Sequence, residues 1–418
     1  MGRMKEYFFA LGTNHTLSKI DIVNTLLKKG VNFEIIEASE EILLVATTAE
    51  LGVEQLIGEL GSAAKIGKVL RFYQKDKWPE EFLMDIQKSD LKEKLAGERF
   101  GISVCGVGGK YKELNEVFYS ARKIGEEIRG ILDIREVRGE GRVLSTVAVD
   151  KNGLLKDGFE LVLCVGSKGI YVGKTLVIQD YESYSFRDYG RPRRDARSGM
   201  IPPKLAKMMI NLAGKGKEDV FLDPFCGSGT ILQELILLGY KNIVGTDVGG
   251  KRTEDSRINL EWLFENYRSL KRDGYKIDIF QCDAKNLSAK ISPQTVDAIV
   301  SEPYLGSAER KFLKLEEVKE EISQLEGLYF AAFSEFRKIL KDGGAIVIVF
   351  PVFRYGNKFF YLQILEKIYS SGFKSGKFLF KEPEGAELLK LQITKRNSVI
   401  FFRPGQAVSR EIFIFERS

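Results

Sequence analysis

The chain has 418 residues, which at about 150 residues a domain is enough for two or three domains that each bury a core. Its 44% hydrophobic and 29% charged residues are typical of globular proteins. The sequence contains no apolar run near the roughly 18 residues of a membrane helix, and its N-terminus has no signal-peptide core. We therefore expect a cytoplasmic protein with no membrane partner.

The histidine and cysteine content excludes several kinds of site. His15 is the only histidine of the chain, which rules out histidine-based triads and histidine-rich metal sites. Cys105, Cys164, Cys226 and Cys282 lie far apart, without the C-x-x-C spacing of zinc or redox sites, and each sits in an apolar segment. We expect buried core thiols and no metal. Catalysis must then depend on carboxylates, hydroxyls, backbone groups or a cofactor.

The first 178 residues predict two small α+β modules. Residues 1–60 alternate short apolar runs with a helical stretch, "LSKIDIVNTLLKKG", that ends at Gly30. Residues 61–178 follow with a strand "RFGISVCGV", a helix "LNEVFYSARKIGEEIRGIL", and three further strands, "LSTVAVD", "FELVLCVG" and "GIYVGKTLVI".

From Val177 to Met208 the composition becomes basic. The stretch "FRDYGRPRRDARSGMIPPKLAKMM" holds seven basic and two acidic residues, a balance of +5 against +6 for the whole chain. A solvated linker would explain this composition. We favour an anion-binding surface, because arginines interleaved with aromatic residues suit phosphates and stacked bases. The arginines expected to contact RNA phosphates are Arg187, Arg191, Arg193, Arg194 and Arg197.

From Lys217 onward, strands and helices alternate as in a parallel, doubly wound α/β sheet. The predicted strands begin with "VFLDPF", "NIVGTDV", "KIDIFQCD", "VDAIVSEP" and "AIVIVFP". Three more, "GKFLFKE", "SVIFFRPG" and "EIFIFE", follow with little helix between the last two, so an antiparallel hairpin is expected at the edge of the sheet.

Polar groups stand at the ends of the first four of these strands, where open α/β sheets bind ligands. The first strand leads into "DPFCGSGT", whose glycines permit a tight turn before a helix. The second ends in Asp247, the third in Asp283 and the fourth in "SEPY". A dinucleotide-dependent oxidoreductase would share the loop and Asp247, but Leu232 stands where a third glycine is needed. We therefore expect an adenosine ligand without a pyrophosphate.

These motifs resemble those of a known family. "DPFCGSGT" with a later Pro-Tyr turn is similar to S-adenosylmethionine-dependent methyltransferases that modify exocyclic amino groups. The flanks "RDYGRPRRDARSGMIPPKLAKMMINLAG" and "RPGQAVSREI" resemble those of archaeal-type tRNA guanine-10 N2-methyltransferases. The resemblance implies a ferredoxin-like domain at residues 1–60, a THUMP RNA-binding domain at 61–178, a basic linker at 179–198 and a Rossmann-fold methyltransferase domain at 199–418.

The resemblance also implies roles for individual residues. Asp247 would bind the ribose of S-adenosylmethionine, Asp283 its adenine, and the glycine loop its methionine moiety. The cofactor-binding residues implied in this way are Asp223, Phe225, Gly227, Gly229, Thr230, Asp247 and Asp283.

The "SEPY" turn departs from the family pattern, because Ser301 stands at the position of Asp and Glu302 at that of the first Pro. The resemblance implies that Tyr304 stacks on the guanine and that Pro303 shapes the turn. The lone pair of the amine is delocalised into the ring, so a hydrogen-bond acceptor must help to localise it. We expect Glu302 or the backbone carbonyl of Ser301 to be that acceptor.

Two alternatives to methylation of guanosine in tRNA stay open at this stage. One is methylation of a purine amine in ribosomal RNA, and the other is a tRNA-binding protein whose catalysis is impaired. The sequence also leaves open whether one or two methyl groups are added and whether a small activating subunit takes part.

Overall fold

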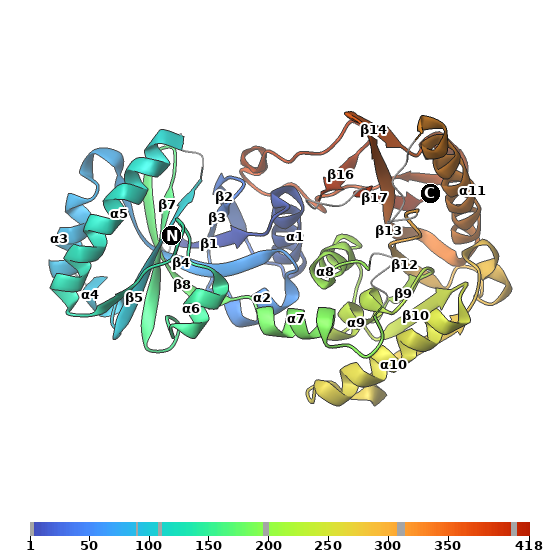
Figure 1. The fold of residues 1–418 in the computed structure, drawn as a ribbon, viewed down its shortest axis with the longest axis horizontal. Coiled ribbons are helices and arrows are strands. Elements are labelled where there is room, and N and C mark those ends of the chain that lie inside the picture. Colours follow the sequence, from blue (N-terminus) through green and yellow to red (C-terminus); the bar gives the residue numbers. More distant parts are fainter. Residues whose placement is uncertain (1–3, 89–90, 108–110, 195–199, 307–313, 403–407) are drawn as a thin grey trace. The chain divides into compact units, whose positions relative to one another are not determined.

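The computed structural model describes residues 4–88, 91–107, 111–194, 200–306, 314–402 and 408–418 (Figure 1). The chain divides into two compact units. Unit 1 comprises Met1–Tyr181 and Lys381–Leu391, and unit 2 comprises Glu182–Phe380 and Gln392–Ser418.

Unit 1 is built on one eight-stranded sheet with the order β2-β3-β1-β4-β8-β7-β5-β6. The long strand β4 pairs with β1 on one side and with β8 on the other, so the sheet runs unbroken from the first residues to the second predicted module. Its strands are β1 (Lys5–Leu11), β2 (Phe33–Ala38), β3 (Ile42–Thr47), β4 (Ala63–Gln74), β5 (Arg99–Gly106), β6 (Arg135–Val137), β7 (Gly158–Val165) and β8 (Gly169–Ile178).

Helices cover this sheet, and their apolar faces form a core with β4, β5, β7 and β8. The helices of unit 1 are α1 (His15–Lys28), α2 (Val53–Glu59), α3 (Glu80–Lys88), α4 (Leu91–Lys94), α5 (Tyr111–Leu132) and α6 (Thr146–Lys151). The predicted first helix is confirmed as α1. It begins where the Asn14 side chain accepts a hydrogen bond from the Leu17 N–H, and it ends before Gly30, which has a φ of 68°.

The stretch "LSTVAVD" was predicted as a strand, and this prediction was wrong. Residues Thr146–Lys151 form helix α6, because the Ser145 side chain caps it by accepting a hydrogen bond from the Ala148 N–H at 3.0 Å. Of the helix residues only Val149 is buried. A strong local cap here overrides the β propensity of the two valines and the threonine.

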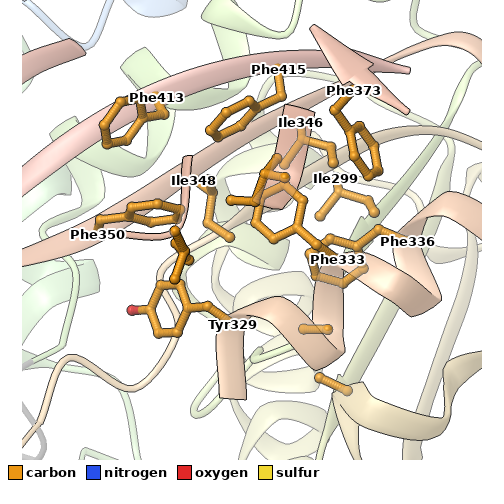
Figure 2. Packing of buried hydrophobic residues seen from close by; sticks show 14 of the residues in the cluster. Ile299, Tyr329, Phe333, Phe336, Ile346, Ile348, Phe350, Phe373, Phe413 and Phe415 are labelled. Carbon is orange, nitrogen blue, oxygen red and sulfur yellow. The ribbon is translucent and has the colours of Figure 1, made fainter. Parts of the chain in front are cut away.

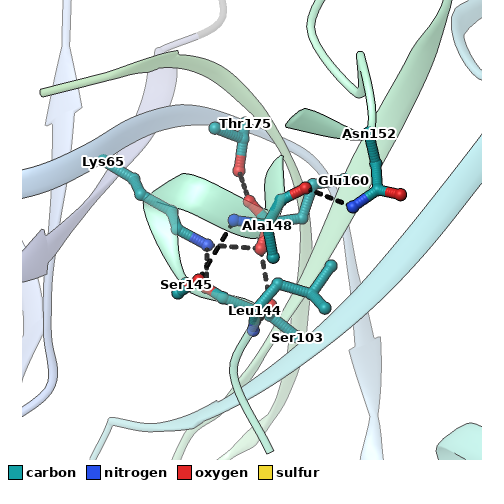
Figure 3. A network of polar contacts seen from close by, with 8 residues as sticks. All are labelled: Lys65, Ser103, Leu144, Ser145, Ala148, Asn152, Glu160 and Thr175. Atoms are coloured by element: carbon teal, nitrogen blue, oxygen red, sulfur yellow. Dashed lines mark hydrogen bonds and ion pairs between the residues drawn. The ribbon is translucent and has the colours of Figure 1, made fainter. Parts of the chain in front are cut away.

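A buried polar network joins four strands of unit 1 (Figure 3). Lys65 Nζ donates to Glu160 Oε1 at 2.5 Å and to the Leu144 carbonyl oxygen at 2.6 Å. The hydroxyls of Ser103 and Thr175 donate to the two oxygens of the same carboxylate. Because each charge is paired and hydrogen-bonded, this buried pair is tolerated, and it fixes the register of β4, β5, β7 and β8.

Residues 381–391 return to unit 1 although the residues on both sides of them belong to unit 2. The Ile35 N–H donates to the Glu384 carbonyl oxygen at 2.9 Å, which extends the edge beside β2. The buried Lys19 Nζ donates to the Leu389 carbonyl oxygen at 2.6 Å. Chain order alone therefore does not define this unit.

Unit 2 contains a sheet with the order β11-β10-β9-β12-β13-β17-β15, to which β14 and β16 add at β13 and β17. Strands β9 to β13 are parallel and β17 is antiparallel to β13, which confirms the parallel sheet with an antiparallel edge. The strands are β9 (Val220–Asp223), β10 (Asn242–Asp247), β11 (Lys276–Gln281), β12 (Val296–Ser301), β13 (Leu340–Tyr355), β14 (Lys358–Tyr361), β15 (Phe373–Ser375), β16 (Ser398–Phe401) and β17 (Val408–Arg417).

Two helices of unit 2 precede β9, and the others alternate with the strands along the chain. The helices are α7 (Tyr181–Tyr189), α8 (Pro203–Leu212), α9 (Thr230–Leu237), α10 (Gly250–Asn266), α11 (Leu315–Ile339) and α12 (Leu365–Ser370). The predicted strand "GKFLFKE" was wrong, since β15 covers Phe373–Ser375 and ends before Gly376, where a side chain would collide with Ile414. Among the described helices, none is long and apolar enough to cross a membrane.

An aromatic core holds α11 against β13 and β17 (Figure 2). Phe333 of α11 meets Phe415 edge-on with ring centroids 5.2 Å apart, and Phe350 of β13 lies 4.9 Å from Phe413. Such ring contacts add to the free energy gained by burying large apolar side chains. They fix the strands beside β12, whose carboxyl end carries the "SEPY" turn.

All four cysteines are buried and free, which confirms the prediction of core thiols. Burial raises the pKa of the Cys105 thiol to about 12, so it stays protonated at neutral pH.

Candidate active site

A cavity of about 410 Å³ opens at the carboxyl ends of the parallel strands of unit 2. Strand order reverses between β9 and β12, and ligands of open α/β sheets bind at this kind of switch point. Of the residues expected in the site, those that line the cavity are Asp223, Phe225, Gly227, Thr230, Asp247, Asp283, Glu302, Pro303 and Tyr304.

The glycine loop shapes one wall of the cavity. Gly227 and Gly229 have φ angles of 51° and 84°, a backbone conformation that residues with a side chain rarely adopt. A Cβ on Gly229 would also lie 2.9 Å from Ser256 Oγ, so both space and backbone demand glycine there. Helix α9 begins at Thr230, and its free N–H groups lie next to the cavity.

Asp247 is held by the backbone at the end of β10. Its Oδ2 accepts a hydrogen bond from the Gly227 N–H at 3.1 Å, and its Oδ1 accepts one from the Gly249 N–H at 2.9 Å. Each oxygen keeps a lone pair that a ligand hydroxyl can use.

Asp283 caps the turn that follows β11, because its Oδ1 accepts from the Lys285 N–H at 3.0 Å. Both carboxylates are thus oriented before any ligand binds.

Asp223 is the most deeply buried carboxyl of the cavity wall. Its Oδ1 accepts from the Ser301 hydroxyl at 2.6 Å and from the Phe225 N–H at 3.1 Å. Burial raises the pKa of Asp223 to about 7, and the negative charges of Asp247 and Glu302 act in the same direction. Asp223 therefore changes its charge near neutral pH.

Ser301 lies behind the cavity wall. Its side chain is fully buried, and its hydroxyl is used by Asp223. The hydroxyl therefore holds Asp223 in place and does not point into the cavity, where Ser301 is not a lining residue. The backbone carbonyl of Ser301 remains a candidate acceptor.

Glu302 lines the cavity and forms an ion pair with Arg410 of β17. Arg410 Nε donates to Oε1, and Nη2 donates to Oε2 at 3.2 Å. The two side chains are only 8% and 4% exposed. Burial raises the pKa of Glu302, whereas Arg410 acts to lower it. Sequence analysis did not pair Arg410 with Glu302, which is 108 residues away, although Arg410 lies in the flank "RPGQAVSREI" that resembles the family.

Tyr304 is 53% exposed and lines the cavity, so a face of its ring is accessible to a planar ligand. The buried Tyr329 of α11 donates its hydroxyl to the Tyr304 carbonyl oxygen at 3.2 Å. This bond anchors the Pro303–Tyr304 turn from beneath. Tyr329 is a second residue that sequence reasoning did not identify.

The predicted RNA-binding arginines fall into two groups. Arg187 is buried, with Nε 2.7 Å from Glu234 Oε1, and Arg191 is buried, with Nη1 donating to Thr230 Oγ1 at 2.7 Å. Their assignment to an RNA surface was therefore wrong. Arg187 ties α7 to α9, and Arg191 supports the first residue of α9.

Arg193 and Arg194 are exposed. The Arg193 backbone is clamped by Asn259, which accepts from its N–H at 2.9 Å and donates to its carbonyl oxygen at 2.8 Å. The Arg194 guanidinium lies 4.9 Å from the centre of the Tyr189 ring. Arg197 lies outside the described residues.

Two protein-family models match the chain, one within unit 2 and one across parts of both units. A model described as "RMKL-like, methyltransferase domain" matches residues 191–376, and one described as "DNA methylase" matches residues 69–256.

Three archaeal relatives are named as tRNA (guanine(10)-N2)-dimethyltransferases. The protein of Methanocaldococcus jannaschii is 27% identical over 229 residues, which are 54% of this chain and 59% of that protein. That of Methanothermobacter thermautotrophicus is 39% identical over 112 residues, 26% of this chain and 28% of the relative. A probable enzyme of Methanothermococcus thermolithotrophicus is 30% identical over 142 residues, 33% of this chain and 83% of the relative. The matches thus span less than two thirds of the first two proteins.

Solved structures share the fold. TrmN from Thermus thermophilus superposes with a TM-score of 0.57 at 16% identity, covering 100% of both chains. A possible methylase from Clostridium difficile 630 gives 0.52 at 14% identity, covering 98% of each chain. The mixed α/β architecture with a Rossmann-like sheet is therefore shared with methyltransferases.

Proposed function

Because the chain belongs to the tRNA (guanine(10)-N2)-dimethyltransferase family, we propose that it methylates the exocyclic N2 amine of a guanosine in tRNA, at position 10. The observation that carries the proposal is a single cavity lined both by a glycine loop with oriented carboxylates and by Glu302, Pro303 and Tyr304 of the "SEPY" turn. The first set of residues suits an adenosine cofactor, and the second suits an aromatic amine.

The residues of the cavity fit S-adenosylmethionine. Asp247 has lone pairs available for the two ribose hydroxyls, and Asp283 can accept a hydrogen bond from the adenine amine. The glycine loop and Thr230 bring backbone N–H groups to the methionine end, where Asp223 can pair with its ammonium group. When bound, the cofactor supplies a methyl group on a sulfonium centre.

On the amine side, we assign acceptance of an N2 hydrogen bond to the Glu302 carboxylate, with the Ser301 carbonyl oxygen as the alternative. An acceptor on the amine shifts electron density towards N2 and so favours attack on the methyl group. A carboxylate does this better than a neutral group. Tyr304 would hold the guanine ring by stacking, and Pro303 keeps the turn rigid.

For tRNA binding, we propose that the exposed Arg193 and Arg194 contact phosphates, together with a ferredoxin-like module at residues 1–60 and a THUMP module at 61–178. Both cations are exposed, and Arg194 lies beside the Tyr189 ring while Arg193 Nε lies 3.6 Å from Asp255 Oδ1. Exposed arginines next to an aromatic ring suit a phosphate backbone. The buried arginines of the same segment have no part in this surface.

The test is transfer of a labelled methyl group from S-adenosylmethionine to bulk tRNA by the purified chain. Digestion to nucleosides and mass spectrometry then separate N2-methylguanosine from N2,N2-dimethylguanosine, and fragment mapping locates the nucleotide. Label confined to ribosomal RNA would favour the ribosomal alternative. Binding of tRNA and cofactor without transfer would favour a binding protein, unless a small activating subunit restores the transfer.

A further inference from the structure

We propose that Arg410 is a positioning residue of the amine site, which holds the Glu302 carboxylate in the orientation in which it accepts a hydrogen bond from the substrate amine. This inference rests on the proposed methyltransferase function and adds a residue to it. Arg410 is not among the residues that line the cavity, and we assign its effect on the site to its contact with Glu302.

The geometry of the pair supports this role. The guanidinium donates from Nε and Nη2 to the two oxygens of one carboxylate, an arrangement that fixes both the position and the plane of that carboxylate. Two of its lone-pair directions are used in this way, and the others stay available. Since Glu302 lines the cavity, its carboxylate can serve Arg410 on one side and a ligand on the other.

The pair is poorly explained as a device for stability. Removing two charges from water costs several kcal/mol per ion, and a buried pair often stabilises a fold no better than apolar residues of the same size. Arg410 lies on β17, opposite Pro351 of β13, and is therefore itself held rigidly by the sheet. A rigid cation that orients a carboxylate at a cavity wall is how a site is preorganised.

Within the part of the chain that the structure describes, the charged and titratable groups that interact electrostatically with Glu302 come from three elements. They are Arg410 of β17, Asp223 at the end of β9 and Tyr329 of α11. Burial raises the pKa of Glu302, and Arg410 is the group that opposes this rise. Loss of the Arg410 charge must then shift protonation of Glu302 to higher pH, so the ionised acceptor is available only at higher pH.

The experiment measures single-turnover methyl transfer from labelled S-adenosylmethionine to tRNA as a function of pH, with full-length parent and variants. Arg410→Gln should lower the rate about ten- to a hundredfold at neutral pH. The acidic limb of its pH profile should move to higher pH, and part of the rate should return there. Arg410→Lys keeps the charge but loses the bidentate contact. The acidic limb of its pH profile should therefore lie closer to that of the parent.

Two further variants separate positioning from folding. Glu302→Gln with Arg410→Gln should be no slower than Glu302→Gln alone, because Arg410 acts through the carboxylate. Arg396→Gln breaks the partly buried ion pair with Glu411, the residue after Arg410, where Nε lies 2.9 Å from Oε1. This variant should lower the melting temperature without moving the acidic limb of the pH profile.

Equal rate loss in Arg410→Gln at every pH, or further loss in the double variant, overturns the inference and leaves the proposed function intact. A parent that transfers no methyl group overturns both.

Discussion

Two sets of residues that line the cavity differ in how they are assembled, and we name them by the roles proposed for them. The cofactor end is the glycine loop with the residues at the ends of β10 and β11, which belong to short motifs. Their mutual contacts run between neighbouring strands, as from the Gly227 N–H to Asp247. The amine end is the "SEPY" turn, whose partners come from distant segments, since Glu302 pairs with Arg410 and the Tyr304 carbonyl oxygen accepts from Tyr329. Motif reading therefore finds the first set more completely than the second.

The largest expected effect tests the amine end. Glu302→Gln should lower single-turnover methyl transfer about ten- to a thousandfold, the range for weakening one transition-state hydrogen-bond partner. Affinity for S-adenosylmethionine should stay near that of the parent, because Glu302 belongs to the other end of the cavity. Calorimetry and single-turnover assays measure the two quantities. Unchanged turnover would transfer the acceptor role to the Ser301 carbonyl oxygen.

A second variant tests the cofactor end. Asp247→Ala should weaken S-adenosylmethionine binding about ten- to a hundredfold, because it removes charge-assisted hydrogen bonds worth roughly 1.5–3 kcal/mol. At saturating cofactor the rate should return close to that of the parent. If Asp247→Ala bound the cofactor as tightly as the parent, Asp247 would not be the ribose ligand.

A third prediction separates the exposed arginines from the buried ones. Arg193→Ala with Arg194→Ala should weaken tRNA binding about tenfold at physiological salt and reduce the salt slope of the binding constant by roughly two. Filter binding over a range of salt concentrations measures both. The matched control is Arg257→Ala with Arg272→Ala, two exposed arginines of unit 2 outside the basic segment. An equal loss in both double variants would mean that the basic segment has no special role.

The smallest effect concerns pH at the cofactor end. The pKa of Asp223 is raised to about 7 by burial, so its carboxylate forms as the pH rises through that value. Pairing with the ammonium group of the cofactor should then strengthen binding about threefold to tenfold between pH 6 and 8. Ser301→Ala removes a hydrogen bond that lowers this pKa and should move the transition to higher pH. A pH-independent affinity in both proteins would contradict the pairing.

The same carboxyl should make folding stability depend on pH in the opposite direction to cofactor binding. The folded-state pKa of Asp223 exceeds the value of about 4 for an unfolded Asp, so the folded protein binds the extra proton. The contribution of Asp223 to stability is therefore greatest below about pH 4 and falls as the pH rises towards 7. Asp223→Asn should remove this part of the pH dependence in denaturant titrations.

The parallel sheet and its ligand edge were predictable because each signal is local. A buried strand followed by a glycine loop and a helix is visible in "VFLDPFCGSGT", and the glycines are required by the backbone at Gly227 and Gly229. Two stretches that the sequence predicted as strands, "LSTVAVD" and "GKFLFKE", are not strands in the structure. The Ser145 cap makes "LSTVAVD" a helix. Strand β15 ends at Ser375, and at Gly376 the backbone passes so close to Ile414 that only glycine fits.

The sequence by itself determined which strand each motif follows along the chain, where the glycine loop lies and where the "SEPY" turn lies. These features could be predicted because hydrophobic periodicity and glycine placement act over a few residues. Only the tertiary structure decided which charges are buried. It placed Arg187 against Glu234, turned Ser301 towards Asp223 and brought Arg410 to Glu302. An arginine reads the same in a sequence whether it faces solvent or a buried carboxylate. Its environment is set by segments far along the chain, through packing that no local pattern records.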